Sequence, residues 1–196
     1  MNKKLINSVI NVFENNIIPL TKKNVNLGNK IFGAAILKKS DYSLIVADTN
    51  KEILNPLWHG EISTINKFFK MKKNKRPSSS ECIFISSHEP CSLCLSAITW
   101  CGFKKFYYLF SYDDTKKKYK IPHDLKILKE VFNIKNGKYN KKNFYWKAHD
   151  LQKIIMDLNE KDKKKYITKI NEIKFLYSKL SYNYQSRKKN IQIPLK

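Results

Sequence analysis

The sequence predicts an α/β fold in which helices cover a central sheet. Its 196 residues suit a single domain, with or without a tail, better than two independent cores. Hydrophobic residues make up 42% of the chain and aromatic residues 13%, which is enough to form a buried core. Over residues 1–110 the apolar patterns follow the order helix, hairpin, helix, strand, helix, strand. This alternation favours the α/β class.

The first elements are a helix and a hairpin. Apolar residues recur at helical spacing within residues 5–20, which predicts an amphipathic helix. The apolar run 31–37 is typical of a buried strand. A turn at residues 41–42 leads to a second strand at 44–47, so we expect these two strands to pair as a hairpin.

The next elements alternate between helix and strand. They are a helix that opens at 55–56, a surface loop at 70–80, a strand at 82–86, a helix at 91–100 and a strand at 105–110. Pro90 suits the first turn of the helix at 91–100, and Gly102 suits the end of this helix. The aromatic side chains of the strand at 105–110 are expected to alternate between core and surface.

The pattern is weaker after residue 111. Helical spacing predicts helices at 123–132, 151–158 and 161–180, and residues 186–196 are expected to be frayed. This half is also the more basic one. Residues 111–196 contain 23 basic and 9 acidic side chains, whereas residues 1–110 contain 16 and 7. The second half is therefore expected to be the more exposed.

The whole chain has a net charge of +23, which leaves two interpretations open. Excess lysine suits binding to nucleic-acid phosphates. However, only two of the 39 basic residues are arginine, the residue that contacts phosphates in a bidentate way. Abundant Lys, Asn and Ile also fit an AT-rich coding sequence, with lysine filling solvated faces. No apolar run approaches the roughly 20 residues of a membrane span, so an integral membrane protein is excluded.

The cysteines indicate the compartment. All four lie within residues 82–101, whereas a secreted disulfide framework would spread them along the chain. Polar residues interrupt the stretch 5–20, so no signal-peptide core is present in it. We therefore expect a reducing cytoplasm, where closely spaced cysteines more often bind a metal.

Two short motifs carry the chemistry, and each lies at the start of a predicted helix. They are Trp-His-Gly-Glu at 58–61 and Glu-Pro-Cys-Ser-Leu-Cys at 89–94. Cys91 and Cys94 are three residues apart, so their sulfur atoms face the same side of a helix. The helix N-terminus also favours thiolates. With His59 they form a three-ligand set that leaves one tetrahedral position open, as in catalytic zinc sites.

Glu61 completes this constellation. Two thiolates cancel the charge of Zn²⁺, so the metal should acidify its water less than one bound by three imidazoles. A general base is then useful, and Glu61 lies two residues from His59. A structural zinc site closed by Cys82 or Cys101 is the alternative, but it has no need of Glu61. Those two cysteines are more simply small buried apolar residues.

On these motifs the chain resembles the cytidine/deoxycytidylate deaminase-like zinc deaminases. The resemblance covers about residues 1–112, and it lies closest to the branch of guanine deaminases and tRNA adenosine deaminases. The matching segments, in order, are Phe32–Ala34, Asn50, His59–Glu61, Glu89–Cys94 and Leu95–Ile98. Residues 97–100 resemble free-base guanine deaminases in particular. Gly60 departs from the branch, where alanine is common, and so does the pair 92–93.

The resemblance implies a three-layer α/β/α sandwich with a central mixed sheet of about five strands. It implies one Zn²⁺ on His59, Cys91 and Cys94, with Glu61 as proton shuttle. The candidate substrate contacts are Asn50, Gly60, Phe32 and His88. Residues 1–112 would form the catalytic core, and residues 113–196 a basic, mainly helical extension packed on it. A homodimer is also implied.

The expected function is hydrolytic deamination of a nucleobase or nucleoside, with a guanine-like purine first and a cytosine-type base next. One alternative is deamination of adenosine in tRNA, with the basic C-terminal half binding the RNA. The other is a zinc-stabilised nucleic-acid-binding protein on a deaminase scaffold. Glu61 argues against the last one, because binding alone requires no proton shuttle.

Overall fold

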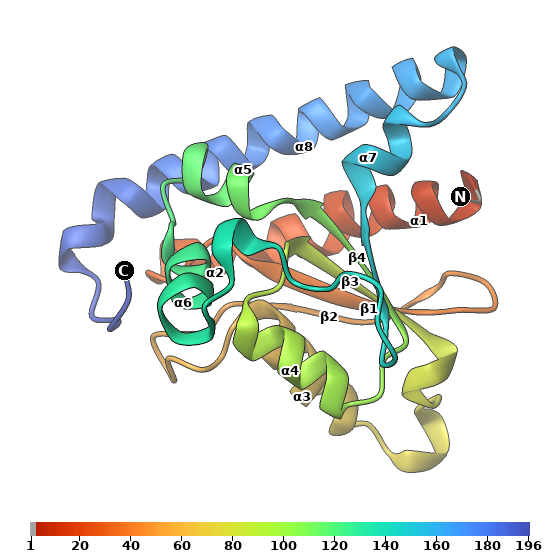
Figure 1. Cartoon of the computed structure of the whole chain (residues 1–196), viewed down its shortest axis with the longest axis horizontal. Coiled ribbons are helices and arrows are strands. Elements are labelled where there is room, and N and C mark those ends of the chain that lie inside the picture. The colour runs from red at the N-terminus through yellow and green to blue at the C-terminus, as the bar shows by residue number, and fades with distance from the viewer. Residues whose placement is uncertain (1–2) are drawn as a thin grey trace.

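The computed structural model describes residues 3–196 and contains a five-stranded mixed sheet (Figure 1). The strand order across the sheet is β2-β1-β3-β4-β5. The strands are β1 (Gly33–Lys38), β2 (Leu44–Thr49), β3 (Cys82–His88), β4 (Lys105–Phe110) and β5 (Lys147–Asp150). The expected sheet of about five strands is therefore confirmed.

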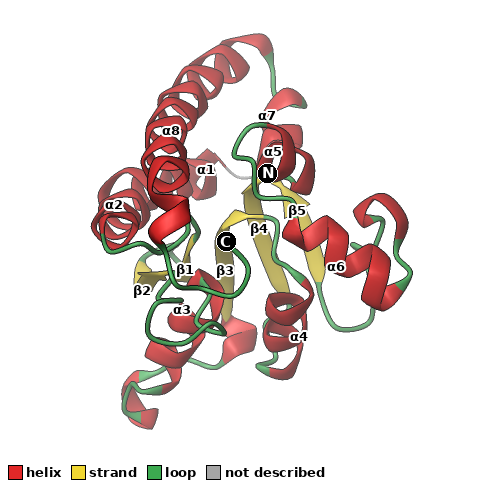
Figure 2. Cartoon of the chain, turned by 90° about the vertical axis from the view of Figure 1, so that its left-hand side faces the viewer, coloured by secondary structure: helices red, strands yellow, loops and turns green. Residues whose placement is uncertain are grey.

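Helices cover both faces of this sheet, as Figure 2 shows. They are α1 (Lys3–Val12), α2 (Ile18–Asn26), α3 (Gly60–Phe69), α4 (Ser92–Trp100), α5 (Tyr112–Lys117), α6 (His123–Phe132), α7 (Leu151–Met156) and α8 (Glu160–Arg187). A π-helical turn at Phe13–Ile17 joins α1 to α2. Helices α1, α2, α7 and α8 pack on one face, and α3 and α4 pack on the other. The three-layer α/β/α architecture is confirmed.

The strand directions explain how the sheet is connected. β1 pairs antiparallel with β2, which confirms the predicted hairpin, and also antiparallel with β3. β3, β4 and β5 run parallel to one another. A parallel pair needs a crossover connection, and α4 supplies it between β3 and β4. The carboxyl ends of β3 and β4 consequently lie at the same edge, where the Glu89 amide donates to the Phe110 carbonyl at 2.7 Å.

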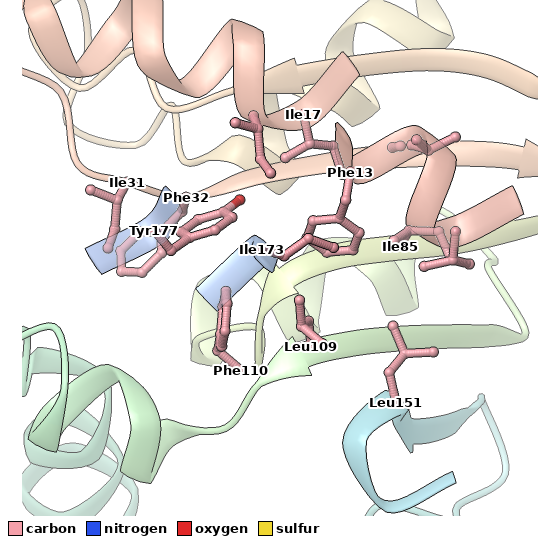
Figure 3. Close-up of a cluster of buried hydrophobic side chains, with 14 of the residues drawn as sticks. Phe13, Ile17, Ile31, Phe32, Ile85, Leu109, Phe110, Leu151, Ile173 and Tyr177 are labelled. Carbon is pink, nitrogen blue, oxygen red and sulfur yellow. The ribbon is translucent and has the colours of Figure 1, made fainter. Parts of the chain in front are cut away.

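Two hydrophobic cores fill the spaces on either side of the sheet. Ile85 and Leu109 face α1 and α8, where they join Phe13, Ile173 and other side chains (Figure 3). Neighbouring strand residues such as Phe84 face the opposite core, against α3 and α4. Residues 106–110 are all buried, so the expected alternation between core and surface in this strand is wrong. The reason is that helices cover both faces of the parallel part of the sheet.

Residues 113–196 share the core of the preceding residues. They contribute β5 to the sheet, and Ile173 and Tyr177 of α8 are fully buried beside Phe13 and Phe110 (Figure 3). The predicted helix at 123–132 is confirmed with the same limits, and α8 continues beyond the expected residue 180 to Arg187. No helix in the described part of the chain is long and apolar enough to cross a membrane.

The N-terminal end of α4 differs from the sequence-based prediction. The helix begins at Ser92 and Cys91 is its N-cap, so Pro90 precedes the helix instead of lying in its first turn. The helix ends as predicted. Gly102 has a φ of +76°, the left-handed conformation that glycine adopts easily after a helix.

The C-terminal stretch also differs from the frayed end that we expected. Ile191 and Ile193 are only 6% and 5% exposed and belong to the core that contains α8. The His123 ring nitrogen Nε2 lies 3.0 Å from the carbonyl oxygen of Lys196. Burial of the two alternate isoleucines provides a reason for the stretch to dock, because buried aliphatic side chains are a main source of stability.

We predict that Ile191→Ala lowers the free energy of unfolding by about 2–4 kcal/mol, since it leaves a cavity in a packed core. Urea unfolding measures this loss. Leu195→Ala is the matched control from the same stretch, because Leu195 is 52% exposed, and it should change stability by less than about 0.5 kcal/mol. Equal stability of the two variants would show that the stretch does not dock.

Candidate active site

The candidate site lies at the edge of the sheet where β3 ends and where α3 and α4 begin. His59 is the N-cap of α3, and Cys91 is the N-cap of α4. Cys94 lies in the first turn of α4 and is fully buried. The two motifs are about 30 residues apart in the chain, and they meet because both helices start at this edge.

The three candidate ligands fit one zinc ion. His59 Nδ1 lies 3.4 Å from Cys91 Sγ and 3.7 Å from Cys94 Sγ, and the two sulfur atoms are 3.5 Å apart. Tetrahedral zinc, with bonds of about 2.3 Å to sulfur and about 2.0 Å to nitrogen, places its ligand atoms roughly 3.5–3.8 Å apart. All three ligand atoms lie within 4.8 Å of one another. The observed spacing therefore suits the metal that the donor set indicates.

No fourth ligand from the described part of the chain closes this cluster. Within residues 3–196, the only group of three or more His, Cys, Asp or Glu side chains with such spacing is His59, Cys91 and Cys94. The Cys82 thiol instead donates a hydrogen bond to the carbonyl of Ser78 at 3.3 Å. A three-ligand set keeps one coordination position available, which is the arrangement of catalytic zinc sites.

The three ligands also perturb one another's proton affinity. A hydrogen bond with Cys94, together with the nearby His59 ring, holds the pKa of Cys91 well below its usual value. Burial raises the pKa of Cys94. Burial lowers the pKa of His59, but Cys91 and the neighbouring carboxylates more than offset this and raise it to about 9 in the metal-free chain. A metal must displace these protons when it binds.

Glu61 lies in the first turn of α3 and is 4% exposed. Its Oε1 accepts a hydrogen bond from the Ser86 hydroxyl at 2.9 Å, and its Oε2 accepts one from the Cys94 thiol at 3.3 Å. Burial, followed by the charge of Cys91, raises the pKa of the Glu61 carboxyl. A carboxyl group with a raised pKa beside the ligand cluster is suited to accept and return a proton. Ser86 carries no motif signal, so the sequence alone does not reveal this contact.

Asn50 is fully buried and bridges two segments of the site. Its Oδ1 accepts from the Gly60 amide at 2.5 Å, and its Nδ2 donates to Glu52 Oε2 at 2.8 Å. The side chain therefore anchors the first turn of α3. Its expected contact with substrate stays a prediction.

Gly60 is pressed against β1. A Cβ atom built at this position would lie 2.7 Å from the Gly33 Cα and 2.9 Å from the Gly33 amide nitrogen. These are backbone atoms, which cannot move aside as a flexible side chain can. The close approach of α3 to β1 therefore explains why glycine suits position 60 in this chain.

Phe32 and His88 lie next to each other beneath the site. Their rings pack edge to face with the centroids 4.4 Å apart, and His88 is 2% exposed. His88 Nδ1 lies 2.9 Å from the Ser87 hydroxyl, and burial lowers the pKa of His88 well below its usual value, which favours the neutral ring. Both residues, with Glu61, line a very small cavity of about 10 Å³.

A larger cavity of about 240 Å³ opens beside the ligand cluster. Phe32, His59 and Cys91 line it from the sheet and the helix starts. Its other walls include the residues Lys30, Glu52, Leu57, Ile121, Asp124, Ile127 and the C-terminal 193–195. None of these nine residues stands in a recognisable motif, and only the folded chain brings them together. Asp124 also lines the small cavity, so its side chain lies close to both.

Trp100 lies away from this cavity. It is 89% exposed, and it follows Cys91 by nine residues, or about 13 Å along the axis of α4. It does not line the 240 Å³ cavity. The segment that resembles free-base guanine deaminases therefore makes no contact with the candidate substrate space.

The chain matches the model of the cytidine and deoxycytidylate deaminase zinc-binding region over residues 12–110, which is half of its length. It therefore belongs to this family. It is a zinc-dependent hydrolytic deaminase of the kind that acts on nucleobases or nucleosides, and its His59, Cys91 and Cys94 could hold the zinc ion. A search of curated protein sequences finds no significant match.

Solved structures with similar folds include guanine deaminases. The guanine deaminase from Bacillus subtilis is 25% identical, with a TM-score of 0.52, over 74% of this chain and 87% of that one. A mutant of NE0047 in complex with 8-azaguanine is 16% identical, with a TM-score of 0.51, over 87% of this chain and 80% of that one. The guanine deaminase from Nitrosomonas europaea is 17% identical, with a TM-score of 0.46, over 80% of each chain.

We predict that Gly60→Ala lowers the free energy of unfolding by about 1–3 kcal/mol, because the added methyl group overpacks the contact with Gly33. Urea unfolding is again the measurement. Ser63→Ala, one turn later in α3, is the control. It removes a buried hydroxyl that makes no hydrogen bond to the described residues, so stability should change little. A Gly60→Ala variant as stable as the parent would mean that α3 can shift away from β1.

Proposed function

We propose that this protein removes the amino group from a free purine-like base, with guanine favoured. In this proposal His59, Cys91 and Cys94 are the ligands of one zinc ion, and Glu61 transfers the protons. The observation that supports it most is the position of the Glu61 carboxyl group. It is buried, has a raised pKa and lies 3.3 Å from the sulfur of Cys94, beside a three-ligand set.

Bound zinc would supply a Lewis acid that polarises water and stabilises negative charge on oxygen. Glu61 accepts a proton from the attacking water and delivers it to the ring nitrogen next to the amino-bearing carbon. The water oxygen bonds to that carbon. Glu61 then accepts the remaining proton from the added hydroxyl group and passes it to the amino group. The carbon–nitrogen bond breaks, ammonia departs and a carbonyl group forms on the carbon. The hydrogen bond from Ser86 to Oε1 holds the carboxyl group in place, so that Oε2 makes these transfers.

The cavity supports a small, uncharged substrate. Its volume of about 240 Å³ is below the usual range for drug-sized ligands, roughly 300–1,000 Å³. Lys30 is its only lining lysine among the described residues, and Glu52 neutralises it at 2.6 Å. Among the described residues, this wall therefore offers a phosphate group no lysine or arginine that lacks a carboxylate partner. These features favour a free base over a nucleotide.

Guanine is favoured by the likeness to the Bacillus subtilis guanine deaminase, and not by Trp100. The docked residues 193–195 line the cavity and restrict the space for an RNA chain, which disfavours tRNA as substrate. A reducing cytoplasm would keep both thiol ligands available. The homodimer, the RNA contact of the basic C-terminal half and the contacts of Asn50, Gly60, Phe32 and His88 with substrate stay predictions.

We predict that Glu61→Gln abolishes ammonia release, because an amide cannot transfer the protons, while the zinc content stays close to one ion per chain. Ammonia assay and elemental analysis measure the two quantities. Cys94→Ala is the contrasting variant and should lose zinc together with stability, since metal binding and folding are linked. Full activity of Glu61→Gln would contradict the role of this residue. A folded, active protein without zinc would contradict the metal site.

We predict that guanine gives the highest kcat/KM in a panel of free bases, nucleosides, nucleotides and tRNA, with ammonia release as the measurement. Cytosine-type bases should rank next. Nucleoside monophosphates should react least among the small molecules, because the described cavity wall offers their phosphate group no lysine or arginine without a carboxylate partner. Turnover of tRNA without turnover of guanine would show that the substrate is tRNA and would contradict the proposed free base. RNA retention that weakens with salt, without any turnover, would instead favour a non-enzymatic, zinc-stabilised nucleic-acid-binding protein.

A further inference from the structure

We propose that Glu52 is a positioning residue that orients the His59 ring for zinc, with Lys30 as its buried counter-ion. This inference rests on the proposed function, in which His59 is a zinc ligand. Neither Glu52 nor Lys30 belongs to the motifs at 58–61 and 89–94.

The two nitrogen atoms of the His59 ring face different partners. Nδ1 faces the sulfur atoms of Cys91 and Cys94, at 3.4 and 3.7 Å. On the other side of the ring, Nε2 lies 3.9 Å from Oε1 of Glu52. This distance is longer than a hydrogen bond, so the interaction is electrostatic. The ring therefore lies between the ligand cluster and a carboxylate.

Glu52 is held in place without any contribution from His59. Its Oε1 accepts from Lys30 Nζ at 2.6 Å, and its Oε2 accepts from the Lys30 amide at 3.1 Å and from Asn50 Nδ2 at 2.8 Å. The Glu52 side chain is 2% exposed and that of Lys30 is 8% exposed. Asn50 in turn accepts from the Gly60 amide, which follows His59 directly. One hydrogen-bond network therefore links the Glu52 carboxylate to the backbone next to His59.

The charge of Glu52 favours one form of the histidine. A negative charge beside Nε2 stabilises a hydrogen on that nitrogen, which leaves the lone pair of Nδ1 free for the metal. Lys30 makes this arrangement possible, because a buried carboxylate without a partner would be costly and would tend to take up a proton. A histidine ligand that faces a carboxylate on its other nitrogen is a recurring arrangement in zinc proteins.

A purely structural role for the ion pair is the competing explanation. Lys30 precedes β1 and Glu52 lies in the segment between β2 and α3, so the pair also joins two parts of the chain. A structural role predicts lower stability with unchanged zinc affinity. A positioning role predicts weaker zinc binding even when the variant is folded.

The experiment compares Glu52→Gln with Asp48→Asn in the full-length chain. Asp48 is a matched control because it is 6% exposed and pairs with Lys51 at 2.6 Å, as Glu52 pairs with Lys30, yet it forms no ion pair with His59. Zinc affinity is measured by competition with a chromophoric chelator, and folding by circular dichroism. Glu52→Gln should weaken zinc binding by about 10–100-fold, the usual loss when such an outer partner is removed. Asp48→Asn should leave it within about twofold of the parent.

A second variant covers the case in which Glu52→Gln does not fold. Lys30→Gln combined with Glu52→Gln removes both charges, so no charge is left buried without its partner, and the same loss of zinc affinity is expected. Parental zinc affinity in a folded Glu52 variant, or an equal loss in Asp48→Asn, would overturn the inference. Failure of the proposed function gives a different result, since Cys94→Ala would then bind zinc as tightly as the parent.

Discussion

The close contact between α3 and β1 is the constraint on which the rest of the site depends. Gly60 and Gly33 bring the two backbones together without intervening side chains, and Asn50 holds the Gly60 amide. This contact places His59 and Glu61 above the carboxyl end of β3. Cys91 and Cys94 arrive at the same edge because the parallel pair β3 and β4 requires a helical crossover. The candidate zinc ligands and the candidate proton-transfer group therefore come together through backbone packing.

Charges are buried around this contact in compensated pairs. Lys30 neutralises Glu52 on the side of α3, and Lys141 neutralises Glu89 at 2.6 Å on the side of α4. The second pair links the Glu-Pro-Cys segment to the chain just before β5. Each paired carboxylate is only about 3% exposed, so removal of its partner would leave a buried charge without compensation. The C-terminal half therefore supports the site through β5, through the segment that precedes β5, and through the C-terminal stretch that docks on the core.

The large positive charge of the chain has little part in this chemistry. Among the described residues, one lysine lines the candidate substrate cavity, and a carboxylate neutralises it. Most lysines are solvated, several of them in short-range pairs along α8 such as Lys163 with Glu160 and Lys169 with Glu172. Exposed pairs of this kind contribute little to stability. The charge is thus separate from the candidate deaminase site.

The sequence by itself determined the class of fold, the three candidate zinc ligands and the candidate catalytic carboxyl group, because these depend on local periodicity and on short motifs at helix starts. Elements with strong local patterns, such as the hairpin and the helix at 123–132, were predicted well. The buried aromatic strand β4, the docked Ile191 and Ile193 and the edge strand β5 were not, since their environment depends on helices distant in the chain. Tertiary structure alone decided the cavity walls and the network of Lys30, Glu52 and Asn50. Contacts between such distant residues leave no periodic trace, because they arise only when packing brings the segments together.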